Sequence, residues 1–329
     1  ILVKFDVDNY ELLLESGNKL PSRDLYFKKG ITWTDISTGN LSARISPKGF
    51  TFSATGACTF PPLEKYDQII GFMNTKVCNE YLKVLAPSLH FTVGDIKNLP
   101  ISSKFKSEFC ENEIKESSNI AKSDYDSRET SWDFQQNELI RFNREGGIET
   151  LEEAYDHYKQ YWQNKFYQLH QNEEELNRRF IEIYGLQEEL TPDVPLDEIT
   201  ILQDELDSKK LKKLNAEFRS QHSAFGKPAL PFKDKEVFAQ FISYAVGCMF
   251  GRYSLDKEGL ILANQGETLQ DYLEKVSKSK EEVSFLPDED NIIPVLDEDW
   301  FEDDIVSRFY AFLKAGFGEK NFEKNLAFV

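Results

Sequence analysis

The sequence has few of the residues that build metal sites, and those it has are scattered. The 329 residues include four histidines with no His-x-x-x-His pair, namely His90, His157, His170 and His222. They also include four cysteines with no Cys-x-x-Cys pair, namely Cys58, Cys78, Cys110 and Cys248. A zinc site needs such ligands at close spacing, so none is predicted. Because no secretory pattern opens the chain, we expect reduced, buried thiols in a cytoplasmic protein.

Glycine-rich loops for phosphates or cofactors are also missing. The chain has no Gly-x-x-x-x-Gly-Lys-Ser/Thr and no Gly-x-Ser-x-Gly string. Its one Gly-x-Gly, Gly316-Phe317-Gly318, stands where we expect a helix to end. A doubly wound nucleotide or S-adenosylmethionine pocket needs a strand, a glycine-rich turn and a helix in succession, so the sequence predicts no such pocket and no cofactor in this chain.

No hydrophobic run is long enough to cross a membrane. The longest uncharged stretch, Val237–Gly251, has 15 residues and is closed by Arg252. A membrane-spanning helix requires about 20. We therefore predict a buried core helix here and no membrane partner.

Positive charge is scarce and unevenly placed. The chain has 39 Lys and Arg against 57 Asp and Glu, a net charge of −18, which for the chain as a whole argues against nucleic-acid binding. Residues 21–110, however, carry eleven basic and seven acidic side chains, whereas 111–200 sum to −13 and 281–329 to −9. A DNA duplex is therefore expected only along residues 21–110.

This basic block has the texture of a small antiparallel sheet. Runs rich in β-branched and aromatic residues alternate with Gly, Asn and Pro, which predicts short strands at Ile31–Thr34, Leu41–Ile45, Phe50–Ser53 and Cys58–Phe60. After Pro61-Pro62 an apolar stripe predicts a helix that ends by Pro87. A further strand at Leu89–Val93 and a turn over 94–101 complete the block.

The rest of the chain has a helical pattern. Apolar residues at steps of three and four predict a helix from Leu151 to Tyr184, ended by Gly185 and about 50 Å long; two shorter helices broken near Gln171-Asn172 are the alternative. Pro192 and Pro195 mark a hinge, and 277–291 an exposed loop. Further helices are expected at about 203–222, 234–251 and 298–315.

Together these patterns predict an α+β protein that is predominantly helical. The predicted domains are a small β-rich domain at 1–110, a helical spacer at 111–185 and a helical C-terminal domain at 186–329. A length of 329 residues agrees with two or three domains.

Two acidic patterns offer only weak catalytic or metal sites. Pro192-Asp193 with Asp207-Ser208-Lys209 loosely fits the spacing of a metal-dependent nuclease, but a helix is predicted over 202–214, where positions i and i+2 point to different faces. The cluster 288–290, 297–299 and 302–304 offers carboxylates to a cation or a basic partner. We favour a solvated face at the start of the 298–315 helix, where acidic residues suit the helix dipole.

The basic block remains as the candidate binding region. Arg and Lys in loops hold phosphates, while Arg, Ser and Thr read base edges in the major groove. The candidate DNA-contacting residues are Arg23, Lys28, Lys29, Thr32, Trp33, Thr34, Arg44, Ser46 and Lys48. For Trp33, packing in the core of the sheet is an equal alternative, and for Lys76 a solvated helix face is favoured.

Several strings in this block resemble a known family. LPSRDLYFKKGITWT at 20–34, SPKGF at 46–50, GFMNTKV at 71–77 and LHFTVGDIKNLPI at 89–101 resemble the target-recognition region of PglX-type adenine-specific DNA methyltransferases. These are enzymes of BREX bacteriophage-exclusion systems, related to type IIG restriction-modification enzymes. The resemblance continues through 123–134, 172–186, 244–254 and 301–306.

The resemblance implies a DNA-binding part of a larger enzyme. Family members methylate N6 of adenine with an Asn-Pro-Pro-Tyr-type motif and S-adenosylmethionine; the nearest string here, Phe60-Pro61-Pro62-Leu63, lacks the amide and the stacking aromatic. The chain therefore resembles the C-terminal part, with no catalytic residue of its own and with S-adenosylmethionine expected for the parent enzyme. The implied partners are double-stranded DNA, the missing N-terminal methyltransferase domain and other phage-defence proteins.

Two other interpretations stay open. One is a non-enzymatic protein-protein docking module of a defence complex, and the other is the specificity region of a type IIG restriction-modification enzyme. A third interpretation, a restriction nuclease, depends only on Asp193 and on Asp207-Ser208-Lys209.

Overall fold

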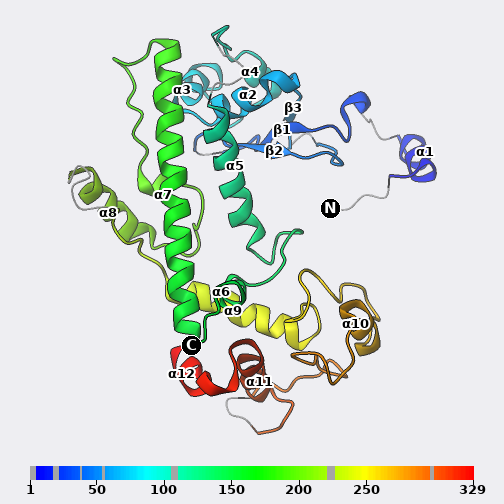
Figure 1. Cartoon of the computed structure of the whole chain (residues 1–329). Helices are drawn as coiled ribbons and strands as arrows, with labels where there is room; N and C mark the ends of the chain where they lie inside the picture. The colour runs from blue at the N-terminus through cyan, green and yellow to red at the C-terminus, as the bar shows by residue number, and fades with distance from the viewer. Residues whose placement is uncertain are drawn as a thin grey trace. The chain divides into compact units, whose positions relative to one another are not determined.

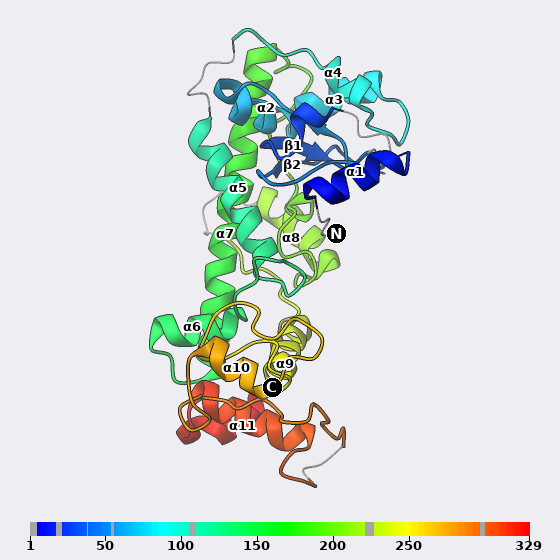
Figure 2. The ribbon, with the colours of Figure 1, turned by 90° about the vertical axis from the view of Figure 1, so that its right-hand side faces the viewer.

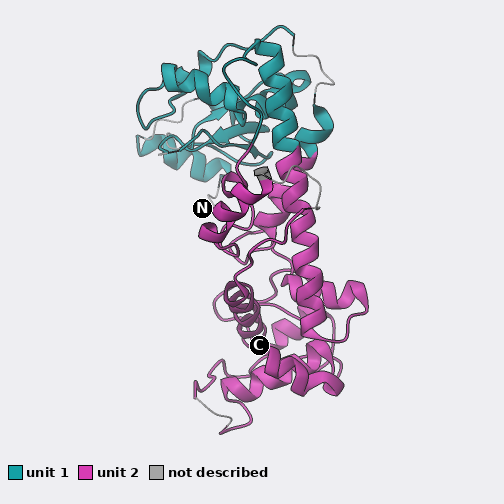
Figure 3. Ribbon diagram, turned by 90° about the vertical axis from the view of Figure 1, so that its left-hand side faces the viewer, with its two compact units in different colours: residues 1–115, 172–193 teal, residues 116–171, 194–329 magenta. Residues whose placement is uncertain are grey.

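The computed structural model describes residues 5–17, 22–37, 39–53, 56–104, 110–220, 227–296 and 300–329. The chain forms two compact units (Figure 3). Unit 1 contains residues 1–115 and 172–193, and unit 2 contains residues 116–171 and 194–329. The division into three sequence segments remains a prediction; the compact units group the residues differently, because the helix over 151–184 contributes to both.

Unit 1 is built on a three-stranded antiparallel sheet. Its strands are β1 (Gly30–Trp33), β2 (Ala43–Ser46) and β3 (Cys58–Thr59), in the order β2-β1-β3. The register pairs Ile31 with Ile45 and with Thr59. Three of the strands predicted for this block are therefore confirmed, within a residue or two at their ends.

Two predicted strands of unit 1 are wrong. Residues 50–53 belong to no strand; the Phe50 carbonyl accepts a hydrogen bond from the Phe27 N–H at 3.0 Å, but no ladder follows. Of Leu89–Val93 only His90 bridges to Ile36. Thr92 and Asp95 form a capping box that starts the helix α4 (Val93–Lys97), and this local cap replaces strand geometry.

Helices cover one face of this sheet. The single helix predicted after Pro62 is two, α2 (Tyr66–Met73) and α3 (Lys76–Leu85), because the Thr75 hydroxyl accepts the Cys78 N–H and begins a new helix. Figures 1 and 2 show both helices on the same side of the sheet. The other helical segments of this part are α1 (Val7–Glu15), η1 (Arg23–Leu25) and η2 (Leu63–Lys65).

The helix α7 (Leu151–Tyr184) is continuous over 34 residues. The structure therefore selects one helix over two, and Gly185 ends it with a φ of +69°, in the left-handed region that glycine adopts without strain. Its first part contributes Trp162 and Phe166 to the core of unit 2. Its last part contributes Leu176 and Phe180 to the core of unit 1.

Unit 2 is helical. Its core contains α9 (Asp234–Met249), which buries Phe241, Tyr244 and Cys248 and confirms the predicted core helix. The remaining helical segments are α5 (Glu111–Asp126), α6 (Glu138–Gly146), η3 (Leu196–Glu198), α8 (Ser208–Ser220), α10 (Leu269–Val276), α11 (Ile305–Phe317), η4 (Glu319–Asn321) and α12 (Phe322–Phe328). The first residues of α5, up to Lys115, belong to unit 1. Gly318 follows α11 with a φ of +81°, as expected for a residue after a helix end.

The fold class predicted from the sequence is confirmed: the protein is α+β and mainly helical, with one small antiparallel sheet among the described residues. In the part of the chain that the structure describes, no helix is both long and apolar enough to span a membrane.

Phe180 tests the contribution of α7 to unit 1. Its side chain is fully buried, and its ring centroid lies 5.7 Å from that of Phe72 in α2. We expect Phe180→Ala to lower the free energy of unfolding by about 3–5 kcal/mol, since the cavity adds to the lost burial. The exposed Val84→Ala in α3 is the control and should change it by less than about 0.5 kcal/mol. Equal effects in urea unfolding would contradict this packing.

Candidate nucleic-acid interface

The register of β1 and β2 separates a core face of the sheet from an open face. Ile31 and Trp33 are buried on the helix-covered face. Thr32 pairs directly with Arg44, and residues that pair across antiparallel strands point to the same side. Because side chains alternate along a strand, Thr34 and Ser46 fall on this side too. Four predicted site residues are thus brought together.

Arg44 is the cation at the centre of the open face. Its side chain is exposed, and its Nη2 donates to the Thr34 hydroxyl at 3.1 Å. Thr32 lies opposite and donates its own hydroxyl to the Ala57 carbonyl at 3.0 Å. The hydrogen bond to Thr34 orients the guanidinium, and its other N–H groups are left for a ligand.

Lys28 and Lys48 lie at one end of the same sheet. The Phe27 N–H donates to the Phe50 carbonyl and the Gly49 N–H to the Phe27 carbonyl, at 3.0 and 3.1 Å. These bonds hold the chain segments that carry the two lysines side by side. Both side chains are exposed.

The charges of these residues are not neutralised by neighbours. Among the described residues, Lys28, Arg44 and Lys48 form no ion pair. By contrast, most cations on α5, α6 and α7 are paired with carboxylates, as in Lys122–Asp133, Arg141–Glu138 and Arg179–Glu113. The open face therefore keeps its positive charge.

Three predicted residues lie elsewhere. Trp33 is 1% exposed and donates its Nε1–H to the Phe91 carbonyl at 2.8 Å, so it takes the core position that the sequence left as an alternative. Lys29 places its Nζ 3.9 Å from the centre of the Tyr66 ring, towards the helices. Arg23 donates to the Tyr10 hydroxyl at 2.7 Å. For Lys76 the sequence favoured a solvated helix face, and here its Nζ donates to the Asp193 carbonyl.

Tyr66 supports the start of β1. Its hydroxyl donates to the Gly30 carbonyl at 2.7 Å. Burial raises the pKa of Tyr66 to about 12, so the hydroxyl remains protonated near neutral pH and keeps this bond. Lys29 above the ring adds a cation–π contact.

Asn74 is a positioning residue that the sequence pattern did not identify. It lies between α2 and α3, where its Oδ1 accepts the Ala43 N–H at 2.9 Å and its Nδ2 donates to the Ala43 carbonyl at 3.1 Å. The side-chain amide thus acts as a substitute strand partner for β2, immediately before Arg44. An isolated Asn in GFMNTKV gives no sign of this role, because it depends on β2 arriving from 31 residues away.

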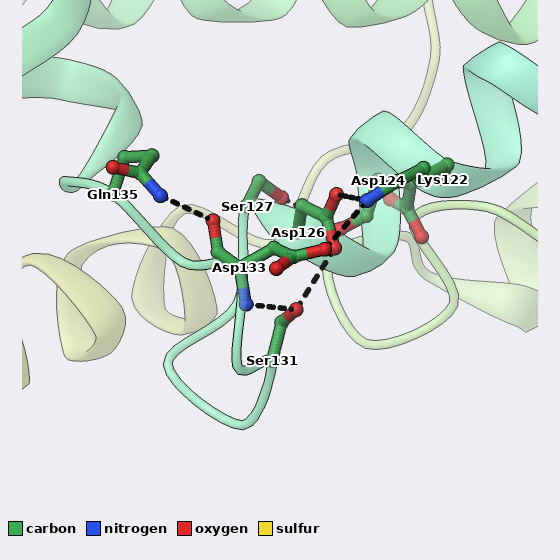
Figure 4. Close-up of polar contacts among 7 residues, drawn as sticks. All are labelled: Lys122, Asp124, Asp126, Ser127, Ser131, Asp133 and Gln135. Atoms are coloured by element: carbon green, nitrogen blue, oxygen red, sulfur yellow. Dashed lines mark hydrogen bonds and ion pairs between the residues drawn. The ribbon is translucent and has the colours of Figure 1, made fainter. Parts of the chain in front are cut away.

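A second polar cluster lies at the end of α5 in unit 2 (Figure 4). The Lys122 Nζ bridges Asp126 and Asp133, and the Ser131 hydroxyl donates to Asp126 at 2.8 Å. The Gln135 side chain donates to the Asp133 carbonyl at 2.9 Å. These side chains contact one another and close a turn. The string at 123–134, which carries part of the family resemblance, therefore has a structural role here.

Next to this turn, Arg128 neutralises a buried carboxylate. Glu205 is fully buried and pairs with the Arg128 guanidinium, which also contacts Asp124 at 2.9 Å and the Gln240 side chain at 3.1 Å. One Glu205 oxygen, Oε2, has no hydrogen-bond partner among the described residues. A buried carboxylate depends strongly on its cation, so Arg128 is expected to be structural.

Each of the two acidic patterns supplies one carboxylate that caps a helix. Asp207 accepts the N–H groups of Lys209 and Lys210 at 3.0 and 3.1 Å at the start of α8, and Asp193 belongs to the other unit. Asp304 caps α11 by accepting the Ser307 N–H at 2.8 Å. Burial opposes its ionisation, but the N–H groups that it accepts outweigh burial and lower the pKa of Asp304 to about 2. Residues 297–299 lie outside the described part.

No group of His, Cys, Asp and Glu among the described residues has the arrangement of a metal site. The four cysteines are free thiols. Burial raises the pKa of Cys78 to about 12, which makes this thiol unreactive.

Comparison with known proteins gives two long matches. The chain is 32% identical over 334 aligned residues, covering all of it, to the adenine-specific methyltransferase BrxX of Escherichia coli O9:H4 (strain HS). It is 33% identical over 310 residues, 92% of the chain, to the adenine-specific methyltransferase PglX of Lacticaseibacillus casei (strain Zhang). The matches cover 25% and 22% of these proteins, so the chain spans about a quarter of their length. No protein-family model matches the chain.

Asn74→Ala tests the positioning role of that amide. Removing it leaves the Ala43 N–H and carbonyl without these partners, and we expect the free energy of unfolding to fall by about 1–3 kcal/mol. Amide hydrogen exchange at Ala43 and Arg44 should accelerate, while Asn40→Ala, at an exposed site just before β2, should change neither quantity. Unchanged exchange in Asn74→Ala would show that β2 is held by β1 alone.

Arg128→Ala tests the buried ion cluster. The variant leaves Glu205 without its cation, and we expect a loss of about 3–5 kcal/mol in the free energy of unfolding. Lys122→Ala removes an ion pair whose lysine is 63% exposed, and should cost at most about 1 kcal/mol. If the two variants unfold at the same urea concentration, the Arg128 cluster does not stabilise unit 2.

Proposed function

Since the chain is homologous over its whole length to a part of the BrxX and PglX adenine-specific methyltransferases, we propose that it is the DNA target-recognition part of such an enzyme. The parent enzyme would methylate adenine in double-stranded DNA within a phage-defence system, in the cytoplasm. The homology supports the methyltransferase and defence context. The assignment of DNA recognition to this chain rests on the open face of its sheet.

The recognition face consists of Thr32, Thr34, Arg44 and Ser46, with Lys28 and Lys48 at its end. The observation that carries the proposal is that its three cations have no acidic partner among the described residues, although the chain as a whole has a net charge of −18. A surface that keeps unpaired cations in an acidic protein has a site for polyanions.

The side chains on this face match the two kinds of DNA contact. Arg44 presents a guanidinium that Thr34 orients, and a guanidinium donates two hydrogen bonds to O6 and N7 of guanine in the major groove. The flanking hydroxyls of Thr32 and Ser46 suit base edges or phosphates. Lys28 and Lys48 suit phosphates, because their flexible ammonium groups contribute charge without a fixed direction.

Catalysis belongs to another part of the parent enzyme. S-adenosylmethionine supplies the methyl group to enzymes of this class, but the described residues of this chain do not fit it. The Phe60-Pro61-Pro62-Leu63 string leads from β3 into η2; Phe60 packs on Phe52 with ring centroids 5.5 Å apart, and Leu63 is exposed. No step of methyl transfer is therefore assigned to this chain, whose task would be to bind and position DNA.

The alternative is a protein docking module without DNA contact. The acidic surface of unit 2 favours protein partners, and residues 281–329, which lie wholly in this unit, sum to −9. Duplex binding separates the two functions: a recognition part binds DNA with an affinity that falls steeply with salt, whereas a docking module binds protein partners and gives no DNA signal. A type IIG specificity region would recognise DNA through the same face.

Charge reversal on the recognition face tests the proposal in the full-length parent enzyme. We expect Arg44→Glu with Lys48→Glu to weaken DNA binding, and to lower the slope of log K against log salt by about 1, because Lys48 is the member of the pair that neutralises a phosphate. The choice of methylation site should also relax or disappear, because Arg44 reads a base.

The matched control is Lys97→Glu with Lys83→Glu, which makes the same charge change on α4 and α3. Unchanged affinity, salt slope and methylation sites in the Arg44 and Lys48 variant would contradict the proposal. An equal loss in the control would attribute the effect to net charge alone.

A further inference from the structure

Four large apolar side chains are exposed together in unit 2. They lie in the connection between α10 and α11, where Ile292 is 69%, Val295 77%, Trp300 68% and Phe301 58% exposed. Single exposed apolar residues are ordinary on protein surfaces, but several within ten residues of one another indicate an interaction site. We call these four residues the apolar strip.

The strip consists of two arms, one with Ile292 and Val295 and one with Trp300 and Phe301. Both arms are hydrogen-bonded at the start of α11. The Ile305 N–H donates to the Pro294 carbonyl at 2.9 Å, which joins the arm of Ile292 and Val295 to the start of the helix. The N–H groups of Trp300 and Phe301 donate to the buried Asp304 carboxylate at 2.5 and 2.9 Å. Short-range hydrogen bonds thus hold the backbone that presents the two aromatic rings.

Hydrogen bonds also fix the beginning of the connection. The Ile292 N–H donates to the Asp290 carboxylate at 2.9 Å, and the Arg308 guanidinium of α11 donates to the Leu286 carbonyl at 2.9 Å. The adjacent side chain of Ile293 packs against the core of unit 2 while Ile292 points away from it. The described residues on both sides of the strip are therefore held by hydrogen bonds while its apolar side chains stay exposed.

The charge around the strip indicates which kind of surface can bind it. Residues 286–304 contain no Lys or Arg, and the exposed acidic residues described among them are Glu289, Asp290, Glu302 and Asp303. Such a surface repels DNA, and attracts a protein surface that combines an apolar groove with Lys and Arg at its rim.

We propose that the apolar strip docks on the remainder of the parent methyltransferase, on an apolar groove with a basic rim. The inference rests on the proposed function, because it takes the chain to be a part of such an enzyme. The relatives are about four times as long as the aligned region, so most of a protein of that kind lies outside these residues. A groove in the same polypeptide is present at high effective concentration, which favours it over a separate protein.

Site-specific photo-cross-linking of the purified full-length parent enzyme tests the proposal without DNA or activity. p-Benzoylphenylalanine replaces Phe301, and Leu260, which is 53% exposed in the same unit, is the matched control position. We expect position 301 to form intramolecular cross-links, at a yield independent of dilution, to peptides outside the 329 residues. Position 260 should give none of these. Val295 is a second probe position, should the probe at 301 disturb folding.

Charge reversal next to the strip completes the experiment. Glu302→Lys with Asp303→Lys should abolish the cross-links from position 301, because both changes oppose a basic rim. The proposal is overturned if neither probe position gives a cross-link outside the 329 residues, or if cross-links form only between separate molecules. DNA affinity is measured in parallel, so a failure of docking is distinguished from a failure of the recognition face.

Discussion

The packing of α7 in unit 1 determines where the recognition face lies. Phe180 of α7 packs on Phe72, and a Cβ on Gly71 would lie 3.9 Å from the Phe180 ring and only 2.6 Å from Ile114. Glycine therefore allows α2 its close approach to these helices. At the end of α2, Asn74 holds the backbone of Ala43, and the next residue is Arg44. One chain of contacts thus runs from the long helix to the proposed DNA contact.

Charge pairing explains why a strongly acidic chain can have a polyanion site. On α5, α6 and α7 most basic side chains are paired with carboxylates, many of them three or four residues away, as in Lys115–Glu111 and Arg178–Glu182. On the short strands and turns of the sheet no such spacing exists, so Arg44 and Lys48 remain unpaired among the described residues. The net charge of the chain therefore says little about the local surface, whereas the pairing of individual cations is informative.

The sequence predicted the features that depend on local pattern. The helix over 151–184, its end at Gly185, the core helix near 237–251 and most of the short strands follow from periodicity and from turn residues. It did not predict the break at Asn74–Thr75, because a single Thr cap divides an apolar stripe that otherwise continues. Nor did it predict that Trp33 lies in the core and Arg44 on the open face, since a shift of one residue in register would exchange the two faces. Neither the role of Asn74 nor the pairing of Arg128 with Glu205 has a local signal, because both partners are distant in sequence.

The central claim is that the open face of the three-stranded sheet contacts DNA. The most direct test is amide hydrogen exchange of the full-length parent enzyme, with and without a duplex that contains its methylation site. We expect slower exchange over residues 28–34 and 43–49 in the presence of DNA, with little change over residues 286–304. Unchanged exchange over both strands, with protection in unit 2 instead, would contradict it.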